Sequence, residues 1–260
     1  MTSPMRVALV LAGAAVLAGA ALRQGDTVTT HGEWVKYAKP GTRDTIRAYV
    51  AYPERKDKAP AVIVIHEIFG LTEWEPTAVD RLAKNGFVAI VPDLLSSRHG
   101  RSPADADSGR KLIGELEPDR VTADLDATYG WLGAQPAVAA DRIGVIGFCW
   151  GGGQSFRYAT NNPKLRAAVV CYGPTPAEGL GRIGAPVLGV YGEDDARINQ
   201  SLPQTETDMQ KLGKRFDRTI YPGTGHGFLK PGRKGNDGLQ PDKAWNNIMA
   251  FYRRELGGKQ

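Results

Sequence analysis

Residues 143–152 read Ile143-Gly144-Val145-Ile146-Gly147-Phe148-Cys149-Trp150-Gly151-Gly152. An apolar, strand-like run leads into glycines that frame a cysteine, and a helical pattern follows from residue 151 to 159. This strand–turn–helix context is typical of a nucleophile elbow, G-x-Nuc-x-G, with Cys149 at the nucleophile position. Cysteines at helix N-termini are frequently reactive as thiolates. The alternative is a glycine-rich turn around an inert, buried cysteine.

Two downstream loops offer the acid and the base that a nucleophile requires. In folds with this elbow the chain order is nucleophile, acid, histidine. An acidic loop after a strand-like run contains Asp194 and Asp195, and the spacing G-x-x-D-x-x-[IV] favours Asp195. His226 follows the next strand-like run, in a glycine-rich loop. A single histidine is more often structural, but three correctly ordered residues at strand ends predict a Cys149–His226–Asp195 triad.

The remaining pattern predicts a layered α/β domain. Continuous apolar runs are typical of strands buried on both faces of a parallel sheet. Such runs lie at residues 61–65, 87–91, 143–147, 167–172 and 186–191, and helical patterns alternate with them. Residues 45–52 alternate like an antiparallel edge strand. We expect one α/β-hydrolase domain over residues 33–260, with a mostly parallel central sheet, helices on both faces and functional loops at the carboxyl ends of the strands.

The loop after the run 61–65 reads His66-Glu67-Ile68-Phe69-Gly70. A loop at this position can supply a backbone N–H to an oxyanion hole, and the residue after the nucleophile supplies the second. These donors would be Ile68 and Trp150. Glu67 is a carboxylate at the mouth of the site, or alternatively a charge at the start of the next helix. His66 is interpreted as structural.

The chain resembles the dienelactone hydrolase family at five places. These are the loop 66–70, Val91-Pro92-Asp93-Leu94, the elbow 147–152, Asp195, and Gly225-His226-Gly227-Phe228. The similarity extends from about residue 60 to the C-terminal helix, and the combination of motifs is specific although each motif alone is not.

The resemblance implies an enzyme that hydrolyses a cyclic enol-lactone or a related small ester, like a carboxymethylenebutenolidase or carboxylesterase, with no metal or organic cofactor. It assigns Glu67 to contact with the resting Cys149 thiol. A basic residue four positions after the catalytic histidine holds the substrate carboxylate in the family, and here that residue is Lys230. A second basic residue falls between Arg98 and Arg120.

The N-terminus predicts export. Arg6 precedes an uncharged apolar stretch at residues 7–22, and Ala18-Gly19-Ala20 resembles a cleavage site. We expect residues 1–20 to be a cleaved export signal, residues 21–32 to be a flexible segment, and the mature protein to be periplasmic or secreted. An uncleaved membrane anchor is the alternative; after cleavage no stable membrane insertion is expected.

The charge and the cysteine content of the chain limit the kinds of partner that we expect. The net charge is +5, without a dense basic run interleaved with aromatic residues, so nucleic acid is not an expected partner. Two cysteines are too few for a disulfide scaffold, and we expect two free thiols, with Cys171 packed in a strand. We expect a monomer that takes a small-molecule ester or lactone. Two alternatives stay open: a thioesterase or peptidase on the same fold, and a non-catalytic binding protein.

Overall fold

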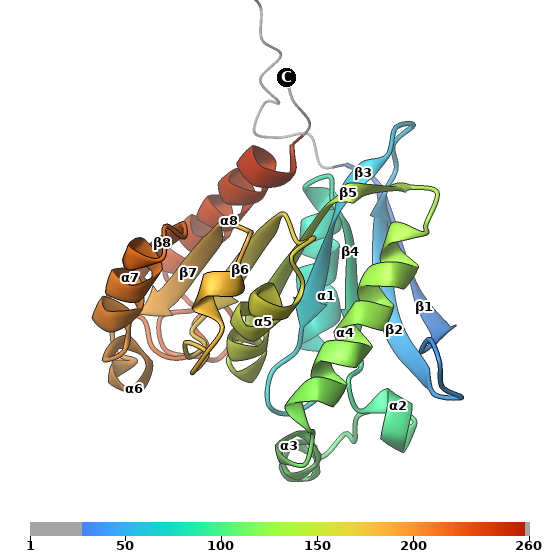
Figure 1. Ribbon diagram of the computed structural model, residues 1–260, viewed down its shortest axis with the longest axis horizontal. Helices are drawn as coiled ribbons and strands as arrows, with labels where there is room; N and C mark the ends of the chain where they lie inside the picture. Colours follow the sequence, from blue (N-terminus) through green and yellow to red (C-terminus); the bar gives the residue numbers. More distant parts are fainter. Residues whose placement is uncertain (1–27, 258–260) are drawn as a thin grey trace, which may run out of the picture.

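An eight-stranded sheet forms the centre of the computed structural model, which describes residues 28–257 (Figure 1). The predicted export signal and residues 21–27 lie outside this range. The strands are β1 (Thr30–Ala38), β2 (Thr45–Pro53), β3 (Ala59–Ile65), β4 (Val88–Pro92), β5 (Val138–Phe148), β6 (Ala167–Cys171), β7 (Val187–Gly192) and β8 (Phe216–Tyr221). Their order is β1-β2-β4-β3-β5-β6-β7-β8, and all pairs from β4 to β8 are parallel.

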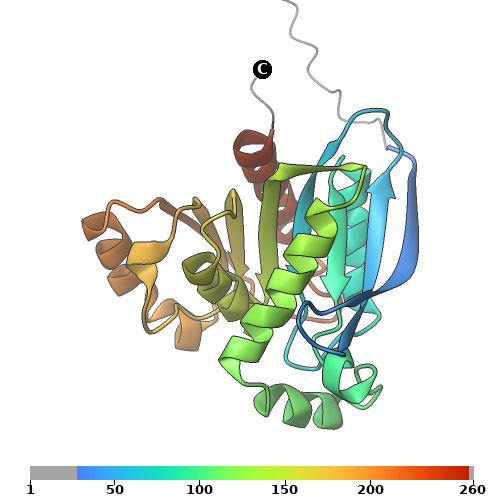
Figure 2. The ribbon, with the colours of Figure 1, turned by 45° about the vertical axis from the view of Figure 1, so that its right-hand side comes forward.

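Helices cover both faces of this sheet. They are α1 (Trp74–Lys84), α2 (Ser96–His99), α3 (Ala106–Gly114), α4 (Pro118–Gly133), α5 (Trp150–Asn161), the 3-10 helix η1 (Leu180–Arg182), α6 (Ala196–Asn199), α7 (Leu202–Lys211) and α8 (Gln240–Leu256). Residues of α1 and α8 pack in one apolar cluster, and residues of α4, α5 and α7 pack in another. Figure 2 shows α4 and α5 in front of the sheet and α8 behind it. The predicted α/β-hydrolase fold class is confirmed.

The central strand carries the elbow. β5 pairs with β3 from Ala59↔Val138 to Ile65↔Gly147, and with β6 on its other side. The strand begins five residues earlier than the apolar run 143–147 predicts, because Val138 pairs with Ala59 of β3 ahead of a register shift. Since β3, β5, β7 and β8 are parallel, the loops that follow them lie at the same edge of the sheet.

The N-terminal end differs from the prediction in two ways. β1 begins at Thr30, so the last three residues of the segment predicted as flexible are strand residues. β1 also forms the edge of the sheet, and β2, predicted as an antiparallel edge, is antiparallel but lies one strand inward. The polar region 96–107, which has none of the apolar runs typical of a strand, contains α2 and the start of α3, whose N-cap Asp105 accepts a hydrogen bond from the Ser108 N–H.

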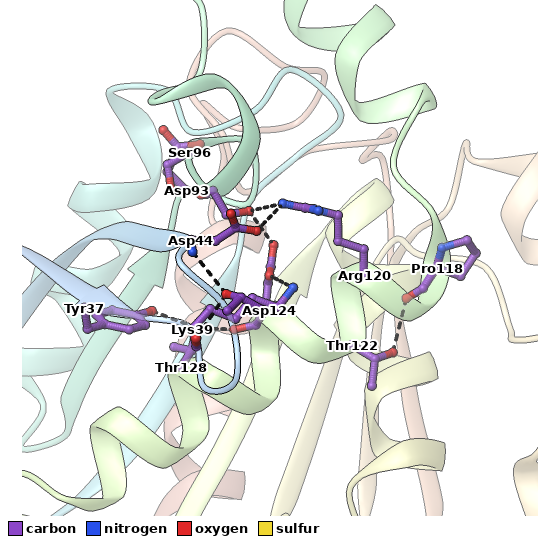
Figure 3. A network of polar contacts seen from close by, with 12 residues as sticks. Tyr37, Lys39, Asp44, Asp93, Ser96, Pro118, Arg120, Thr122, Asp124 and Thr128 are labelled. Atoms are coloured by element: carbon purple, nitrogen blue, oxygen red, sulfur yellow. Dashed lines mark hydrogen bonds and ion pairs between the residues drawn. The ribbon is translucent and has the colours of Figure 1, made fainter.

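A polar network fastens the turn between β1 and β2 to helix α4 (Figure 3). Lys39 forms an ion pair with Asp124 at 2.6 Å, and both side chains are nearly buried, at 11% and 1% exposure. Arg120 pairs with Asp44 at 3.1 Å, and the Tyr37 hydroxyl lies 2.7 Å from the Thr128 hydroxyl. The network fixes the position of the β1–β2 hairpin against the body of the domain.

Among residues 28–257, no helix combines the length and the apolar composition that a membrane crossing requires.

Candidate active site

Cys149 occupies a strained turn between β5 and α5. Its backbone has φ 57° and ψ −117°, outside the regions that side-chain-bearing residues favour. A Cβ at Gly147 would collide with the carbonyl of Gly151, and a Cβ at Gly151 would collide with the carbonyls at the end of β3. Both glycines are therefore required by close backbone approach. Cys149 is partly exposed, whereas Cys171 is buried in β6, and both are free thiols.

Asp195 and His226 are brought together, as the spacing predicts. The Nδ1 of His226 lies 2.5 Å from Oδ2 of Asp195. The Asp195 side chain is buried at 6% exposure, and the imidazole is one-third exposed. Asp194, the other candidate, turns away and pairs with Lys234 at 2.6 Å on the surface. The carboxylate that orients the imidazole is thus Asp195.

The imidazole of His226 also lies near enough to the thiol of Cys149 for the thiol to affect its pKa. Burial lowers the pKa of His226, but hydrogen bonding to Cys149 and Asp195 and the negative charge of both groups outweigh it and raise the pKa to about 9. At neutral pH the ring is therefore protonated. Three segments far apart in the chain thus meet at one sulfur atom.

The loop 66–70 lies beside the elbow, because His66 stacks on Trp150. Trp150 opens α5, so its N–H belongs to the first turn, which has no acceptor within the helix. Within the described range, the Ile68 N–H also has no acceptor among backbone or side-chain groups. His66 is fully buried; its Nδ1 lies 2.9 Å from the Glu67 carbonyl, and its Nε2 accepts from the Leu94 N–H. His66 therefore shapes the loop, in keeping with a structural role.

Glu67 and Lys230 form an ion pair inside the site. The Nζ of Lys230 donates to Oε2 of Glu67 at 2.9 Å, and the Glu67 side chain is almost completely buried, at 3% exposure. The ammonium also lies over the rings of Phe69 and Trp74. Among residues 28–257, the Glu67 carboxylate accepts a hydrogen bond from Lys230 and not from the Cys149 thiol.

A groove of about 830 Å³ begins at Lys230 and Phe69. Its far wall is the β1–β2 hairpin, which contributes Trp34 and Arg47, with the Arg47 guanidinium 3.4 Å from the centre of the indole ring. The loop between α2 and α3 adds Arg101, which lies in the region where the resemblance places a second basic residue. The sequence pattern did not indicate Trp34 or Arg47, because an alternating strand shows which residues share a face but not what that face meets.

The aromatic residues near the elbow divide between core and site. Phe148 is fully buried beneath Trp74, edge to face at 4.7 Å. Trp150 is partly exposed and stacks on His66. Two further residues, Glu75 and Tyr172, belong to the surroundings of the site without having been predicted there. Glu75 is fully buried and accepts from the N–H and the hydroxyl of Thr72.

Within residues 28–257, no group of three or more histidine, cysteine, aspartate or glutamate side chains is arranged to hold a metal ion.

The fold, the elbow and the Asp195–His226 pair define an α/β-hydrolase. The profile of the dienelactone hydrolase family matches residues 46–256. A provisionally named carboxymethylenebutenolidase of Salmonella typhimurium is 33% identical over 239 residues, covering 85% of this chain and 87% of that protein. The chain belongs to the dienelactone hydrolase family and is a hydrolase of lactones or esters.

Two further relatives agree with this placement. A provisionally named 2-oxo-3-(5-oxofuran-2-ylidene)propanoate lactonase of Bradyrhizobium is 30% identical, covering 90% of this chain and 98% of that protein. The crystal structure of a provisionally named dienelactone hydrolase of Klebsiella pneumoniae superposes with a TM-score of 0.77 at 27% identity. It covers 87% of this chain and 99% of the Klebsiella chain.

Proposed function

We propose that this chain hydrolyses small esters or lactones that carry a carboxylate, through an acyl-enzyme on Cys149. The observation that carries the proposal is the linkage of Asp195, His226 and Cys149. Asp195 lies 2.5 Å from one side of the imidazole, and the contact of Cys149 with the ring helps to raise the pKa of His226. A buried acid that orients a histidine beside a nucleophile is the arrangement that activates thiols for acyl transfer.

The proposed reaction has two halves. In the first, the Cys149 sulfur attacks the carbonyl carbon, the carbon–oxygen bond of the ester breaks, and His226 gives its proton to the leaving oxygen. In the second, His226 takes a proton from water as the water attacks the thioester, and the sulfur departs as thiolate. The N–H groups of Ile68 and Trp150 would hold the oxyanion in both halves; one such donor is worth about 2.7–4 kcal/mol in comparable enzymes.

The groove supports a substrate with a negative charge. Arg47, Arg101 and Lys230 line it, and the aromatic faces of Trp34 and Phe69 lie between them. The carboxylates of Glu73 and Asp93 also line it, but Asp93 already accepts hydrogen bonds from the backbone N–H and the hydroxyl of Ser102. A substrate carboxylate that reaches Lys230 would compete with Glu67 for the ammonium, so Lys230 is the proposed substrate-binding residue.

The test compares two cysteine variants on matched aryl esters. Cys149→Ala should lower kcat/KM by at least about a thousandfold, because the nucleophile is removed. Cys171→Ala is the control, because Cys171 is buried in β6 and takes no part in the proposal. Each ester should be assayed with and without a carboxylate on its acyl part, and the charged member should have the higher kcat/KM. Iodoacetamide should label Cys149 first.

Undiminished turnover by Cys149→Ala, or selective labelling of Cys171, would exclude the proposed mechanism. Equal kcat/KM for the charged and neutral esters would leave the nucleophile in place but refute the role of the basic groove.

A further inference from the structure

A stacked pair of side chains, Trp34 and Arg47, forms the far wall of the groove. Trp34 lies opposite Tyr49 in the register of β1 and β2, so Arg47, two residues before Tyr49, is its diagonal neighbour on the same face. The guanidinium carbon of Arg47 lies 3.4 Å from the centre of the indole ring. Trp34 is still 48% exposed in spite of these contacts. The pair therefore belongs to the surface of the groove and not to the core.

The backbone of Arg47 is fixed to another wall of the groove. Its N–H donates to the Ser96 Oγ at 2.9 Å, and its carbonyl accepts from the Asp93 N–H at 2.8 Å. The Ser96 hydroxyl in turn donates to the Asp93 carbonyl at 2.6 Å, and Asp93 itself lines the groove. The guanidinium is thus held both by its backbone and by the ring beneath it, so little ordering is required when a ligand binds.

The positive charge of Arg47 is not neutralised by a neighbouring carboxylate. None of the ion pairs within residues 28–257 includes it. Stacking on an aromatic face leaves the N–H groups at the edge of a guanidinium free, and that planar fork suits the two oxygens of a carboxylate. A fixed guanidinium with a free edge, in the wall of a groove, is suited to binding an anion.

A second cation lies where the groove begins. The Lys230 ammonium lies over the ring of Phe69, next in the chain to Ile68, and pairs with Glu67. Apolar side chains, among them Phe69 and Leu71, line the groove together with the two cations. Its volume of about 830 Å³ is in the range that accepts ligands well above the size of a simple lactone. The groove therefore offers two anion sites with apolar surface between them.

We propose that the substrate is an elongated ester or lactone with two anionic groups, the nearer bound by Lys230 and the farther by Arg47. This inference rests on the proposed function and adds to it the length and the second charge of the substrate. The segment between the two charges is apolar and packs on Trp34, Phe69 and Leu71. No bond is made or broken at the Arg47 end, so this residue contributes affinity and selectivity rather than chemistry.

The experiment measures binding by calorimetry, which requires no turnover. Dicarboxylic acids from succinate to sebacate are compared with their own monoamides, which keep the length and lose one charge. Wild-type enzyme should bind the longer diacids about tenfold more tightly than their monoamides, the size expected for one charge-assisted hydrogen-bonded pair. Arg47→Gln should abolish this preference. It should leave the Kd of succinate, the shortest diacid, unchanged, because the Lys230 end of the groove remains intact.

Arg43→Gln is the matched control for Arg47→Gln. Arg43 is exposed in the turn of the same hairpin and does not line the groove. The substitution removes the same charge from the same ribbon, so this variant should bind every diacid and monoamide as the wild type does. Loss of the preference in Arg43→Gln would mean that the overall charge of the hairpin, and not a site at Arg47, selects the diacids.

Equal binding of diacids and monoamides by the wild type at every length would overturn the inference, because the groove would then hold a single anion. A preference that survives in Arg47→Gln would also overturn it, and its disappearance in Arg101→Gln would place the second charge at the loop between α2 and α3 instead. These results do not depend on the nucleophile. Full turnover by Cys149→Ala would refute the acyl-enzyme and leave the preference for diacids standing.

Discussion

His226 is the residue whose charge matters most to the proposed chemistry. Its contacts with Cys149 and Asp195 more than offset burial and hold its pKa at about 9. In the proposed mechanism, the proton that His226 holds in the resting enzyme is the one that the leaving oxygen receives. Loss of this proton from the free enzyme should therefore stop acylation.

The pH dependence of kcat/KM follows from the protonation of His226 in the free enzyme. Because the imidazolium form is the active one in acylation, kcat/KM for an aryl ester should fall as pH rises through about 9. Asp195→Asn removes one of the groups that raise the pKa of His226, so the descending limb should move to lower pH. The measurement is initial rate against pH for both enzymes. A limb at the same pH in the variant would contradict the role given to Asp195.

Single residues differ in how well the sequence predicts them. Cys149, Asp195 and His226 each follow a strand at a recognisable spacing, so their meeting could be predicted. The Glu67–Lys230 ion pair could not, because it joins residues 163 positions apart and depends on the side-chain path of the lysine. Tyr172 was interpreted as the last residue of a strand, since its turn conformation is imposed by the neighbouring elbow and leaves no pattern in the chain.

Strands and helices also differ in how well the sequence predicts them. The buried parallel strands were predictable because continuous apolar runs have few other uses in a domain of this size. Helix α3 was missed because its sequence is polar and only Gly109 and Ile113 are buried. The place of the β1–β2 hairpin was also missed. Its contribution to the groove depends on the network around Asp124, which joins elements that local patterns cannot connect.

The Lys39–Asp124 ion pair of that network leads to a prediction about the free energy of unfolding. Lys39→Met leaves the nearly buried carboxylate of Asp124 without its ion-pair partner, and should lower the free energy of unfolding by about 3 kcal/mol. Adding Asp124→Leu should recover much of this loss, because an uncharged pair avoids the unpaired buried charge. Urea denaturation of the single and double variants provides the measurement. A double variant less stable than Lys39→Met would show that the ion pair itself contributes the stability.

At the scale of the whole molecule, the order of the strands in the sheet could not be predicted from the sequence. β3 lies between β4 and β5, an arrangement set by crossover connections rather than by any local pattern. The central position of β5 then gives Cys149 neighbouring loops on both sides. The domain range of 33–260 remains a prediction, with β1 beginning slightly before it.

Export and assembly are predictions at this scale. The basic residue Arg6 followed by an apolar stretch should direct export, and cleavage near Ala20 should give a mature chain that behaves as a monomer. Intact mass of protein from the periplasm or medium should show loss of about 20 N-terminal residues, and light scattering should give the mass of one chain. Recovery of the full-length chain from membranes would favour the uncleaved anchor instead.

The β1–β2 hairpin takes part in the proposed function through the groove that it helps to line. It supplies Trp34 and Arg47 to the groove but no atom of the Asp195–His226–Cys149 linkage, and Trp34 lies before the first residue that the family profile matches. In the proposed function, one part of the recognition surface is thus encoded apart from the reacting groups, whereas Lys230 lies close to His226 in the chain. Exchange of this short ribbon between homologues is a route to new selectivity that leaves bond cleavage intact.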